Sequence, residues 1–524
     1  MMPHLEQTRL GLQRLLDDQK SQKQRNVMGQ FSTPGQLARD VLRFARTIVP
    51  AHCAVRFLDP AFGTGSFYSA LLAEFPSEQI SSAEGVEIDP HYGIPTADLW
   101  AASSLRFRLA DFTTLDPPPE AEKPNLIICN PPYVRHHHLD LSSKTRLSEV
   151  AARSSGIAVG GLAGLYCYFM VIAHAWLAEG GVAGWLIPSE FMDVNYGSAI
   201  RKYLTERVQL LQIHRFDPAE LQFGDAQVSS AVVWFRKCSP QSNHLVTMSY
   251  GGTLCAPKIH REAKVSELQA SRKWSRLAQA ALRTPVGRSK LSDLFKVKRG
   301  LATGDNSFFV LTEEKATSLD LPRQFLKPLL PSPRYVEGDV IHSDVDGLPL
   351  SSRRLYLLDC DLSEDEVLRL SPPLAKYLGA GREKALETYI CSRRTPWYSQ
   401  EARPPAPIVC TYMGRGLEKR ERPFRFILNN SNATALNVYL MLYPTPMLAR
   451  AMGKDQQLIS KIWEVLREVP AEALLGEGRV YGGGLYKMEP KELANLPADQ
   501  IMALLPKNDA EGMIQEEMFS NRVA

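Results

Sequence analysis

The chain has 524 residues, of which 44% are hydrophobic, 23% charged and 9% aromatic. A single hydrophobic core stops growing at about 250 to 300 residues, so this length predicts two or three domains. The composition excludes an intrinsically disordered chain, because disorder requires low hydrophobicity and high charge. Since 61 Lys and Arg residues face 57 Asp and Glu residues, the formal net charge is only +4. This excludes a uniformly basic surface and leaves a locally basic cleft possible.

Cysteine usage and the N-terminus predict a reducing, cytoplasmic location. The eight cysteines form no CxxC pair and no regular spacing with histidine, which argues against a disulfide framework and a zinc site. The first residues show no signal-peptide core. Residues 154–178 contain no Asp, Glu, Lys or Arg, but four glycines interrupt their first half. We therefore interpret LYCYFMVIAHAWLA as a buried helix and expect no membrane span.

Helical and strand patterns alternate along the first half of the chain. Residues 5–24 carry leucines at helical spacing, and in the following turn Ser32 or Thr33 is expected to cap a helix that Pro34 begins. Short apolar runs then alternate with helical patterns, at residues 54–60, 83–90, 125–133, 181–189, 210–216 and 229–235. This alternation predicts an α/β fold with a doubly wound, mostly parallel sheet over about residues 25–238. In such sheets, ligands bind beyond the carboxyl ends of the strands.

The character of the sequence changes after Lys237, where a polar break is followed by a segment rich in Lys and Arg. Beyond it, the chain is rich in proline, with aromatic and basic residues interleaved. We predict an α/β domain at 1–240, a helical linker at 241–285, a mixed α+β domain at 286–505 and a flexible tail at 506–524.

Three acidic residues end successive strands in the predicted sheet. Asp59 opens the loop Asp59-Pro-Ala-Phe-Gly-Thr-Gly65, whose backbone N–H groups and following helix can receive a carboxylate or a phosphate. The loop matches neither GxGxxG nor the P-loop pattern, and an ordinary tight turn is the alternative. Glu87 ends the next strand, and Asp111 with Phe112 follows another. Together they predict a pocket for an adenosine that carries a carboxylate-containing group.

The segment Asn130-Pro-Pro-Tyr133 directly follows the apolar strand NLIIC. Its two prolines cannot donate backbone hydrogen bonds and hold the chain rigid. The Asn130 side-chain oxygen and the Pro131 carbonyl would thus be fixed acceptors for an exocyclic NH2 group, and Tyr133 would offer a stacking face to a planar ring. The alternative is an ordinary Asn-Pro turn.

With these motifs in this order, residues 25–238 resemble the S-adenosylmethionine-dependent DNA amino-methyltransferases, most closely the gamma class with its Taq-type adenine-N6 enzymes. The resemblance implies a Rossmann-like catalytic domain, a C-terminal target-recognition domain, and S-adenosyl-L-methionine as cofactor. It makes Asn130, Pro131, Pro132 and Tyr133 the catalytic residues. Gly29 and Phe31 would border the cofactor's methionine end. The cofactor-binding residues would be Thr33, Pro34, Asp59, Pro60, Ala61, Gly63, Gly65, Glu87, Ile88, Asp111 and Phe112.

The resemblance also implies contacts with the target base and with DNA. Phe223 would stack on the flipped base opposite Tyr133; a core position for Phe223 is the alternative, with Phe216 as the rival candidate. Residues expected to contact DNA phosphates, or else to lie on a solvated face, are Arg135, Lys296, Lys298, Arg299 and Arg415. We expect no metal site, because the consecutive residues His136, His137 and His138 cannot easily converge on one ion.

The expected function is methylation of the N6 amino group of a flipped-out adenine in double-stranded DNA, within a restriction-modification system. We expect a monomer and, because no nuclease motif is recognised, we expect any restriction endonuclease partner to be separately encoded. Cytosine-N4 methylation is the first alternative, although cytosine-specific members more often carry serine at the position of Asn130. A glutamine-N5 protein methyltransferase is a further alternative, but this function would give the second domain no role. A non-catalytic DNA-binding module would not need all of these motifs.

Overall fold

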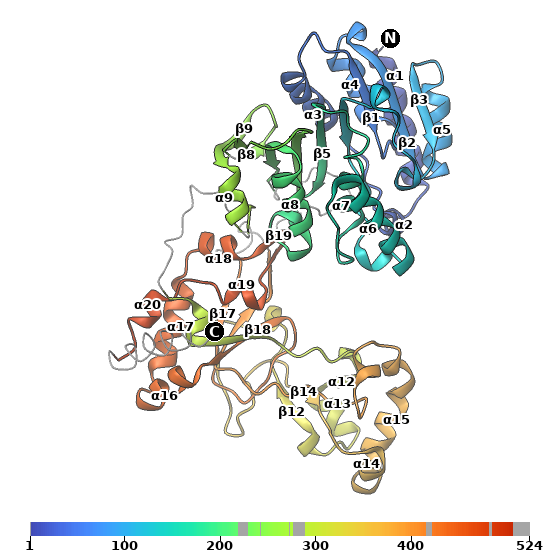
Figure 1. The fold of residues 1–524 in the computed structure, drawn as a ribbon. Helices are drawn as coiled ribbons and strands as arrows, with labels where there is room; N and C mark the ends of the chain where they lie inside the picture. Colours follow the sequence, from blue (N-terminus) through green and yellow to red (C-terminus); the bar gives the residue numbers. More distant parts are fainter. Residues whose placement is uncertain are drawn as a thin grey trace. The chain divides into compact units, whose positions relative to one another are not determined.

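The computed structural model describes residues 2–217, 229–241, 243–271, 273–275, 289–415, 422–481 and 485–506. These residues form two compact units, which we describe separately (Figure 1). The first unit contains the described residues up to 275 and Tyr481, and the second contains residues 289–480 and 485–506.

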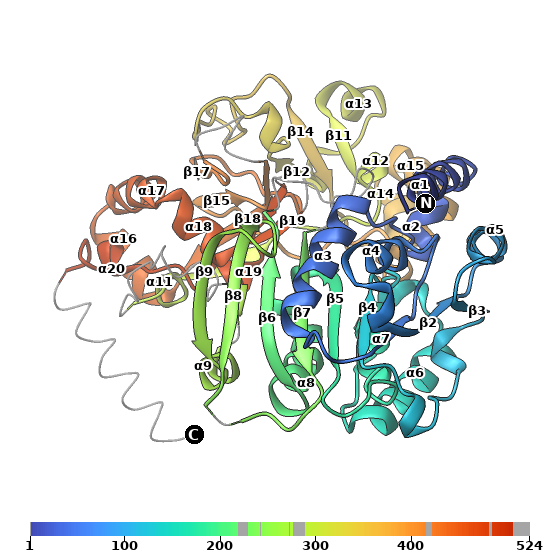
Figure 2. The same ribbon diagram turned by 90° about the horizontal axis from the view of Figure 1, so that it is seen from above.

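The first unit is built on one nine-stranded sheet. Its strands are β1 Val55–Asp59, β2 Ile80–Glu87, β3 Leu105–Leu109, β4 Leu126–Cys129, β5 Val182–Pro188, β6 Gln209–Arg215, β7 Ser230–Arg236, β8 Leu245–Gly252 and β9 Pro257–Lys264. Their order in the sheet is β3-β2-β1-β4-β5-β7-β6-β8-β9, and Figure 2 shows the part from β4 to β9. The five strands from β3 to β5 run parallel, whereas β7 is antiparallel to both β5 and β6. The predicted doubly wound, mostly parallel sheet is confirmed.

Apolar runs explain why the central strands form. All seven positions of β5 and all four of β4 are buried, as expected for strands that are covered on both faces.

The helices of the first unit are α1 Met2–Asp18, α2 Gln22–Met28, α3 Gly35–Ile48, α4 Ser66–Glu74, α5 Pro90–Trp100, α6 Leu141–Ser155, α7 Leu165–Ile172, α8 Ser198–Glu206 and α9 Val265–Ala270. Short 3-10 helices are η1 Ser77–Gln79, η2 Phe112–Thr114, η3 Glu120–Glu122, η4 His136–His138, η5 Ser189–Met192 and η6 Asn195–Gly197.

The helix α3 lies across one face of the sheet (Figure 2). Its buried apolar residues are Leu37, Ala38, Val41, Leu42 and Ala45, a spacing that forms one apolar stripe on a helix. The predicted buried helix at 165–178 is confirmed for residues 165–172, which form α7 with seven of its eight residues buried, and is wrong for residues 173–178, which are not helical.

Three other sequence-based expectations about elements are wrong. The predicted linker at 241–285 is not helical throughout, because β8 and β9 extend the sheet across much of it and α9 covers only Val265–Ala270. The strand β9 lies at the sheet edge and is mostly exposed, so charged residues dominate it and hide its strand pattern. The opening helix breaks after Asp18, and α2 starts anew from a capping box at Ser21. Finally, α3 has Pro34 at its N-cap, and neither Ser32 nor Thr33 caps it.

The second unit contains three small sheets with the strand orders β10-β18-β15-β17-β13, β11-β14-β12 and β16-β20-β19. The strands are β10 Phe295–Arg299, β11 Val310–Thr312, β12 Leu326–Leu329, β13 Val340–Ile341, β14 Leu355–Leu358, β15 Ile408–Thr411, β16 Met413–Arg415, β17 Phe426–Asn429, β18 Tyr439–Pro444, β19 Arg479–Tyr481 and β20 Leu485–Lys487. This unit confirms the predicted mixed α+β character.

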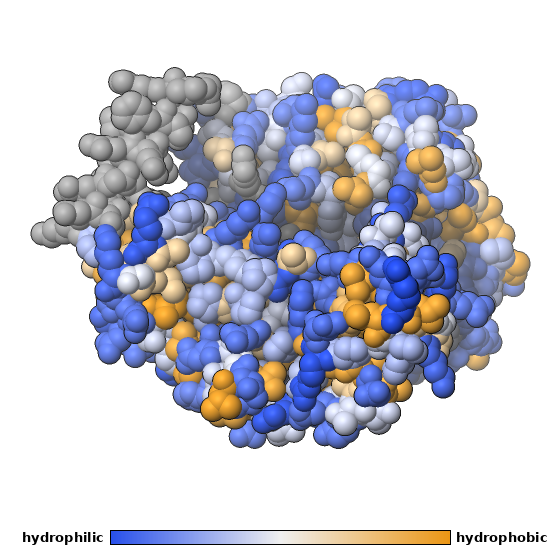
Figure 3. Space-filling view, turned by 90° about the horizontal axis from the view of Figure 1, so that it is seen from below, coloured by the Kyte–Doolittle hydropathy of each residue, from blue (hydrophilic) through white to orange (hydrophobic). Residues whose placement is uncertain are grey.

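Helices surround these sheets in the second unit. They are α11 Leu291–Leu294, α12 Asn306–Phe309, α13 Glu313–Ser318, α14 Glu364–Leu370, α15 Pro372–Leu386, α16 Pro446–Lys454, α17 Leu458–Glu468, α18 Ala471–Glu477, α19 Pro490–Leu493 and α20 Asp499–Met502, with 3-10 helices η7 Arg323–Phe325, η8 Pro333–Tyr335 and η9 Cys391–Arg393. Within the described ranges, no helix has the length and hydrophobicity needed to cross a membrane. The face in Figure 3 is mostly hydrophilic, with hydrophobic side chains in small groups.

Candidate functional site

A cavity of about 280 Å³ lies in the first unit, where the parallel strands β1, β2, β3 and β4 end. This volume is close to the lower end of the range of about 300 to 1,000 Å³ for small-molecule sites. The acidic or amide residue at each of these strand ends lines it: Asp59, Glu87, Asp111 and Asn130. The carboxyl edge of the sheet is therefore the ligand edge, as the fold class predicts.

The cavity gathers most of the residues predicted to bind the cofactor. All of them line it except Pro34, which precedes α3, and Gly65, which precedes α4. Of the predicted catalytic segment, Asn130 and Pro132 line the cavity, whereas Pro131 and Tyr133 do not.

The loop after β1 is held by Glu87 of the neighbouring strand. The Glu87 carboxylate accepts hydrogen bonds from the backbone N–H groups of Gly63 and Asp89, both at 2.9 Å. Gly63 has a φ of +56°, and a Cβ atom built on it meets no atom within 4 Å. The loop thus exposes backbone with open space before it, which lets a ligand approach closely.

Two buried carboxyl groups give this end of the cavity its electrostatic character. Asp59 is 1% exposed, and burial, with a further contribution from Glu87, raises its pKa to about 8. Burial likewise raises the pKa of Glu87. Because burial opposes ionisation of both groups, and the Glu87 charge further opposes that of Asp59, a cationic ligand here would stabilise both in their ionised forms.

Another part of the cavity wall is formed by Asp111, Phe112 and the helix α6, which sequence reasoning missed. The Asp111 carboxylate accepts hydrogen bonds from the Thr113 N–H at 2.9 Å and the Thr113 hydroxyl at 2.7 Å. Arg146 of α6 donates to the Thr113 carbonyl at 3.1 Å and lies 3.5 Å from the Asp111 carboxylate. The Phe112 ring is 1% exposed and packs on Trp176 at 5.0 Å between ring centroids.

The side chain of Asn130 has a fixed orientation. Its amide nitrogen donates to the Phe31 carbonyl at 2.9 Å and to the Thr33 hydroxyl at 3.1 Å. Its oxygen Oδ1 is buried and has no hydrogen-bond partner among the described residues. A buried acceptor without a partner costs about 1 to 3 kcal/mol, so this oxygen is suited to a ligand that carries an N–H or O–H donor.

Tyr133 is buried in this structure and does not present a face to the cavity. It is 8% exposed, its hydroxyl donates to the Leu186 carbonyl at 3.0 Å, and its backbone N–H donates to the Gly29 carbonyl at 3.0 Å. Its ring lies 5.5 Å from that of Phe31, which does line the cavity.

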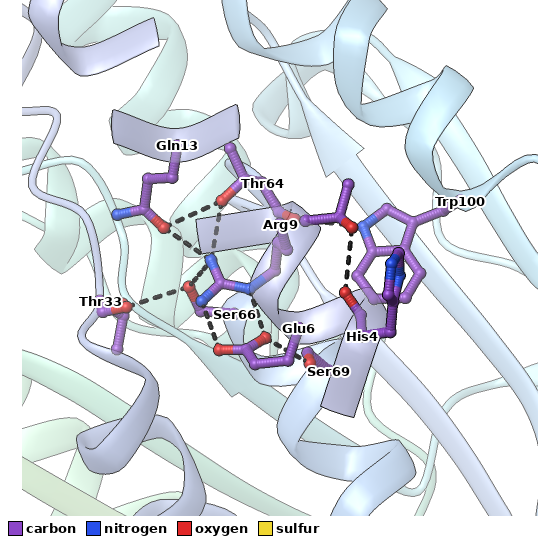
Figure 4. Close-up of polar contacts among 10 residues, drawn as sticks. His4, Glu6, Arg9, Gln13, Thr33, Thr64, Ser66, Ser69 and Trp100 are labelled. Atoms are coloured by element: carbon purple, nitrogen blue, oxygen red, sulfur yellow. Dashed lines mark hydrogen bonds and ion pairs between the residues drawn. The ribbon is translucent and has the colours of Figure 1, made fainter. Parts of the chain in front are cut away.

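Residues before the sheet complete the site. Gln13 of α1 and Gln30 line the cavity, and Gln30 donates to the Asp89 carboxylate at 2.6 Å, to which Lys20 also donates. Gln13 belongs to a buried hydrogen-bond network around Arg9 (Figure 4). Neither glutamine belongs to a motif, so the sequence offered no signal for them.

The residues predicted to contact the base and DNA are placed only in part. Phe223 lies outside the described residues, as does the side chain of Arg415, while Phe216 is a core residue that is 3% exposed. Arg135, Lys296 and Arg299 are exposed, and Lys298 is half-buried. The Arg299 guanidinium lies 3.9 Å from the centre of the Tyr412 ring. Within the described ranges, no cluster of three His, Cys, Asp or Glu residues could hold a metal ion.

Comparison with known proteins identifies the family. A model described as "Eco57I restriction-modification methylase" matches residues 98–222, and "Type II methyltransferase M.Eco57I, C-terminal domain" matches residues 272–522. Type II methyltransferase M.XamI from Xanthomonas campestris pv. amaranthicola is 30% identical over 487 residues, which cover 89% of this chain and 84% of the relative. The chain belongs to the Eco57I-type restriction-modification methylases.

A second curated relative agrees with the assignment, and a solved structure shares the fold. Type II methyltransferase M.AccI from Acinetobacter calcoaceticus is 25% identical over 493 residues, 90% of this chain and 85% of the relative. The fold matches the DNA complex of the Type IIL restriction-modification enzyme MmeI with a TM-score of 0.53 and 13% identity, over 88% of this chain and 64% of that chain.

The methylase is therefore a DNA methyltransferase of a restriction-modification system that uses S-adenosylmethionine. This assignment favours DNA methylation over the two non-DNA-methylating alternatives, a glutamine-N5 protein methyltransferase and a non-catalytic DNA-binding module. The cavity fits the cofactor's chemistry, because a buried acidic pair faces the space that its positively charged groups would occupy.

Proposed function

We propose that this methylase transfers a methyl group to the N6 amino group of an adenine extruded from double-stranded DNA. The observation that carries the proposal is the Asn130 oxygen, buried and without a partner among the described residues, at the edge of a cavity that fits the cofactor. An exocyclic amino group supplies the donor that this acceptor lacks.

The cofactor would span the cavity between the acidic residues at the strand ends. Asp111 and Phe112 would contact the adenine of the cofactor, Glu87 the ribose hydroxyls, and the loop Asp59 to Gly65 with Thr33 the methionine end. When bound, S-adenosylmethionine supplies an electrophilic methyl group. Asp59 and Glu87 favour such a ligand because its positive charge offsets the mutual repulsion of their carboxylates.

Asn130, which lines the cavity, and the carbonyl of Pro131, which in the ligand-free structure does not, would hold the target amine by its two hydrogens. Two fixed acceptors draw the nitrogen lone pair out of conjugation with the ring and aim it at the methyl group. Positioning of this kind can contribute roughly 7 to 11 kcal/mol to catalysis. No strong general base is required, because the amine becomes acidic only once it is methylated.

Extrusion of the base costs a few kcal/mol, which aromatic stacking at about 1 to 3 kcal/mol per base can offset. We assign stacking to Tyr133 and Phe223. For Tyr133 this requires the neighbouring Phe31 ring, 5.5 Å away and on the cavity wall, to make room for the base. Phe223 lies outside the described residues, and its role stays a prediction.

The second unit, which lies within the match to the C-terminal domain of M.Eco57I over residues 272–522, would read the DNA sequence. Arg135, Lys296, Lys298, Arg299 and Arg415 would contact phosphates, which position a protein on DNA without specifying sequence. We also propose that the methylase acts as a monomer beside a separately encoded restriction endonuclease.

Cytosine-N4 methylation is the second candidate, because a cytosine amine offers the same two donors to Asn130. Tritiated methyl transfer to a mixed-sequence duplex, followed by digestion to nucleosides, separates the two. Label in N6-methyladenine supports the proposal, and label in N4-methylcytosine contradicts it.

A further inference from the structure

A buried arginine contacts the loop of residues 59–65, which we call the cofactor loop (Figure 4). Arg9 of α1 is 0% exposed, and its guanidinium binds the Glu6 carboxylate through two hydrogen bonds, Nε to Oε2 at 2.7 Å and Nη2 to Oε1 at 2.8 Å. Glu6 also accepts from the Ser69 hydroxyl at 2.6 Å. Burial alone would raise the pKa of Glu6, but these hydrogen bonds lower it, so the ion pair persists at neutral pH.

The third nitrogen of Arg9 points away from Glu6 and contacts three cavity-lining residues. Nη1 lies 2.6 Å from Gln13 Oε1, 3.0 Å from the Thr64 hydroxyl and 2.9 Å from the Ser66 hydroxyl. The Ser66 hydroxyl in turn donates to the Thr33 carbonyl at 3.0 Å. One arginine thus joins α1, the cofactor loop and the segment that holds Asn130.

Arg9 determines which way the Gln13 amide faces. A guanidinium has only donors, so the Gln13 oxygen must face Arg9, and this oxygen also accepts from the Thr64 hydroxyl at 3.1 Å. The amide nitrogen lies on the other side, and no hydrogen bond from it to a described residue is formed. Gln13 therefore offers a neutral donor on the wall of a cavity whose acidic groups offer only acceptors when ionised.

We propose that Gln13 binds the carboxylate of the cofactor's methionine end and that Arg9 is the positioning residue that orients it. Arg9 cannot bind this carboxylate itself, because Glu6 neutralises it and the network uses all three of its nitrogens. The inference rests on the proposed placement of the cofactor, with its methionine end at the loop Asp59 to Gly65.

The test compares two thioether ligands by titration calorimetry: S-adenosylhomocysteine, and its decarboxylated form, which lacks only the carboxylate. Arg9→Lys and Gln13→Met should each raise the Kd of S-adenosylhomocysteine at least tenfold, and leave the Kd of the decarboxylated ligand within twofold of the unmodified protein. Lysine keeps the positive charge but lacks the planar guanidinium with its three nitrogen donors. It therefore cannot bind Glu6 and orient Gln13 at the same time. In methyl transfer, both variants should raise KM for S-adenosylmethionine with kcat changed less than threefold.

Arg14, exposed on the same helix, provides the matched control, and Arg14→Lys should change neither Kd. An unchanged affinity for S-adenosylhomocysteine in Gln13→Met, or an equal loss for both ligands, overturns the inference. Thermal unfolding without ligand shows whether Arg9→Lys is folded. If it is not, Gln13→Met, at a half-buried position, decides alone.

A further variant separates this inference from the placement on which it rests. Glu87→Ala should weaken binding of both ligands, because both contain the ribose. If Glu87→Ala weakens neither, the cofactor does not lie in this cavity and the placement fails. If it weakens both while Gln13→Met and Arg9→Lys bind normally, only the inference about Gln13 and Arg9 fails.

Discussion

The Asn130 amide nitrogen donates to the Thr33 hydroxyl at 3.1 Å, across 97 residues of sequence. A second bond to the Phe31 carbonyl, at 2.9 Å, fixes the same nitrogen. With both of its N–H groups directed at these acceptors, the amide can turn only its oxygen toward a ligand, and that oxygen is the acceptor left without a partner among the described residues. The segment before α3 is thus a structural part of the candidate amine-binding site.

Asn130→Ala should reduce methyl transfer at least 1,000-fold, on the order of 4 kcal/mol. The loss is expected because the variant lacks the acceptor that orients the amine. S-adenosylmethionine should still bind within threefold, since the predicted cofactor residues are untouched. Asn195→Ala, at an exposed position in the same unit, is the control and should leave both quantities unchanged. Weakened cofactor binding with normal turnover at saturation would refute the role of Asn130.

Thr33→Val should lower the single-turnover rate at saturating cofactor about tenfold, equivalent to about 1.4 kcal/mol. Valine has the shape of threonine but lacks the hydroxyl that accepts from Asn130, so the amide loses one of its two anchors. Thr33→Ser restores an acceptor and should recover most of the rate. If serine and valine behave alike, the hydroxyl does not act on Asn130.

Cofactor affinity should rise with pH through the titration of Asp59. Burial, and secondarily Glu87, raise the pKa of Asp59 from 3.8 to about 8, so the ligand-free folded protein holds a proton there at neutral pH. Because its pKa is raised in the fold, protonated Asp59 contributes to the stability of the ligand-free protein. This contribution is fully present below pH 3.8 and is lost as pH rises through about 8. A cationic cofactor favours the carboxylate, so its binding releases the proton.

Calorimetry of S-adenosylmethionine binding between about pH 6 and 8 should thus show a Kd that falls as pH rises, with protons released. Asp59→Asn should flatten this dependence; Glu87, whose pKa burial also raises, accounts for what remains. Identical pH dependence in the variant and the unmodified protein would exclude Asp59 as the titrating group.

Gly29→Ala should damage the catalytic segment. Gly29 has a φ of +64°, and an added Cβ would lie 2.3 Å from the backbone nitrogen of Tyr133. Gly180, with a φ of +76° and no atom within 4 Å of an added Cβ, isolates the backbone cost of about 1 kcal/mol. Urea unfolding should show a loss of ~3 kcal/mol for Gly29→Ala and ~1 kcal/mol for Gly180→Ala, and only the former should lower methyl transfer. Equal losses of unfolding free energy in the two variants would mean that the backbone around Tyr133 moves aside at no cost.

Phe223→Ala should weaken stabilisation of the extruded base. With 2-aminopurine at the target position, the unmodified protein should raise fluorescence as the base leaves the stack. Loss of a stacking partner should reduce that signal several-fold, since stacking contributes about 1 to 3 kcal/mol. An unchanged signal would assign the stacking to another aromatic residue.

The sequence predicted the ligand edge well because it depends on local patterns. Asp59, Glu87, Asp111 and Asn130 each follow an apolar strand, and parallel neighbouring strands bring such ends to one edge. The family resemblance then named 13 of the 31 residues that line the cavity.

What sequence reasoning missed depends on tertiary contacts. Arg9 looks like a solvent-facing charge on an amphipathic helix, because arginine is seldom fully buried without a partner. Only the fold shows that Glu6 and the loop residue Thr64 surround it. Arg146 lies in a helix 35 residues after Asp111, with no periodicity that links them. Thr33 was predicted to cap a helix because threonine commonly does so, a preference that depends only on the neighbouring sequence. Its observed partner, Asn130, is 97 residues away.

A crystal structure with a cofactor analogue and a duplex that carries the target adenine would show whether Asn130 holds the extruded amine. We expect Asn130 Oδ1 to lie within hydrogen-bond distance of the N6 amine, with the analogue between Asp59 and Asp111. An analogue bound elsewhere, or an Asn130 oxygen turned into the protein interior, would contradict this expectation.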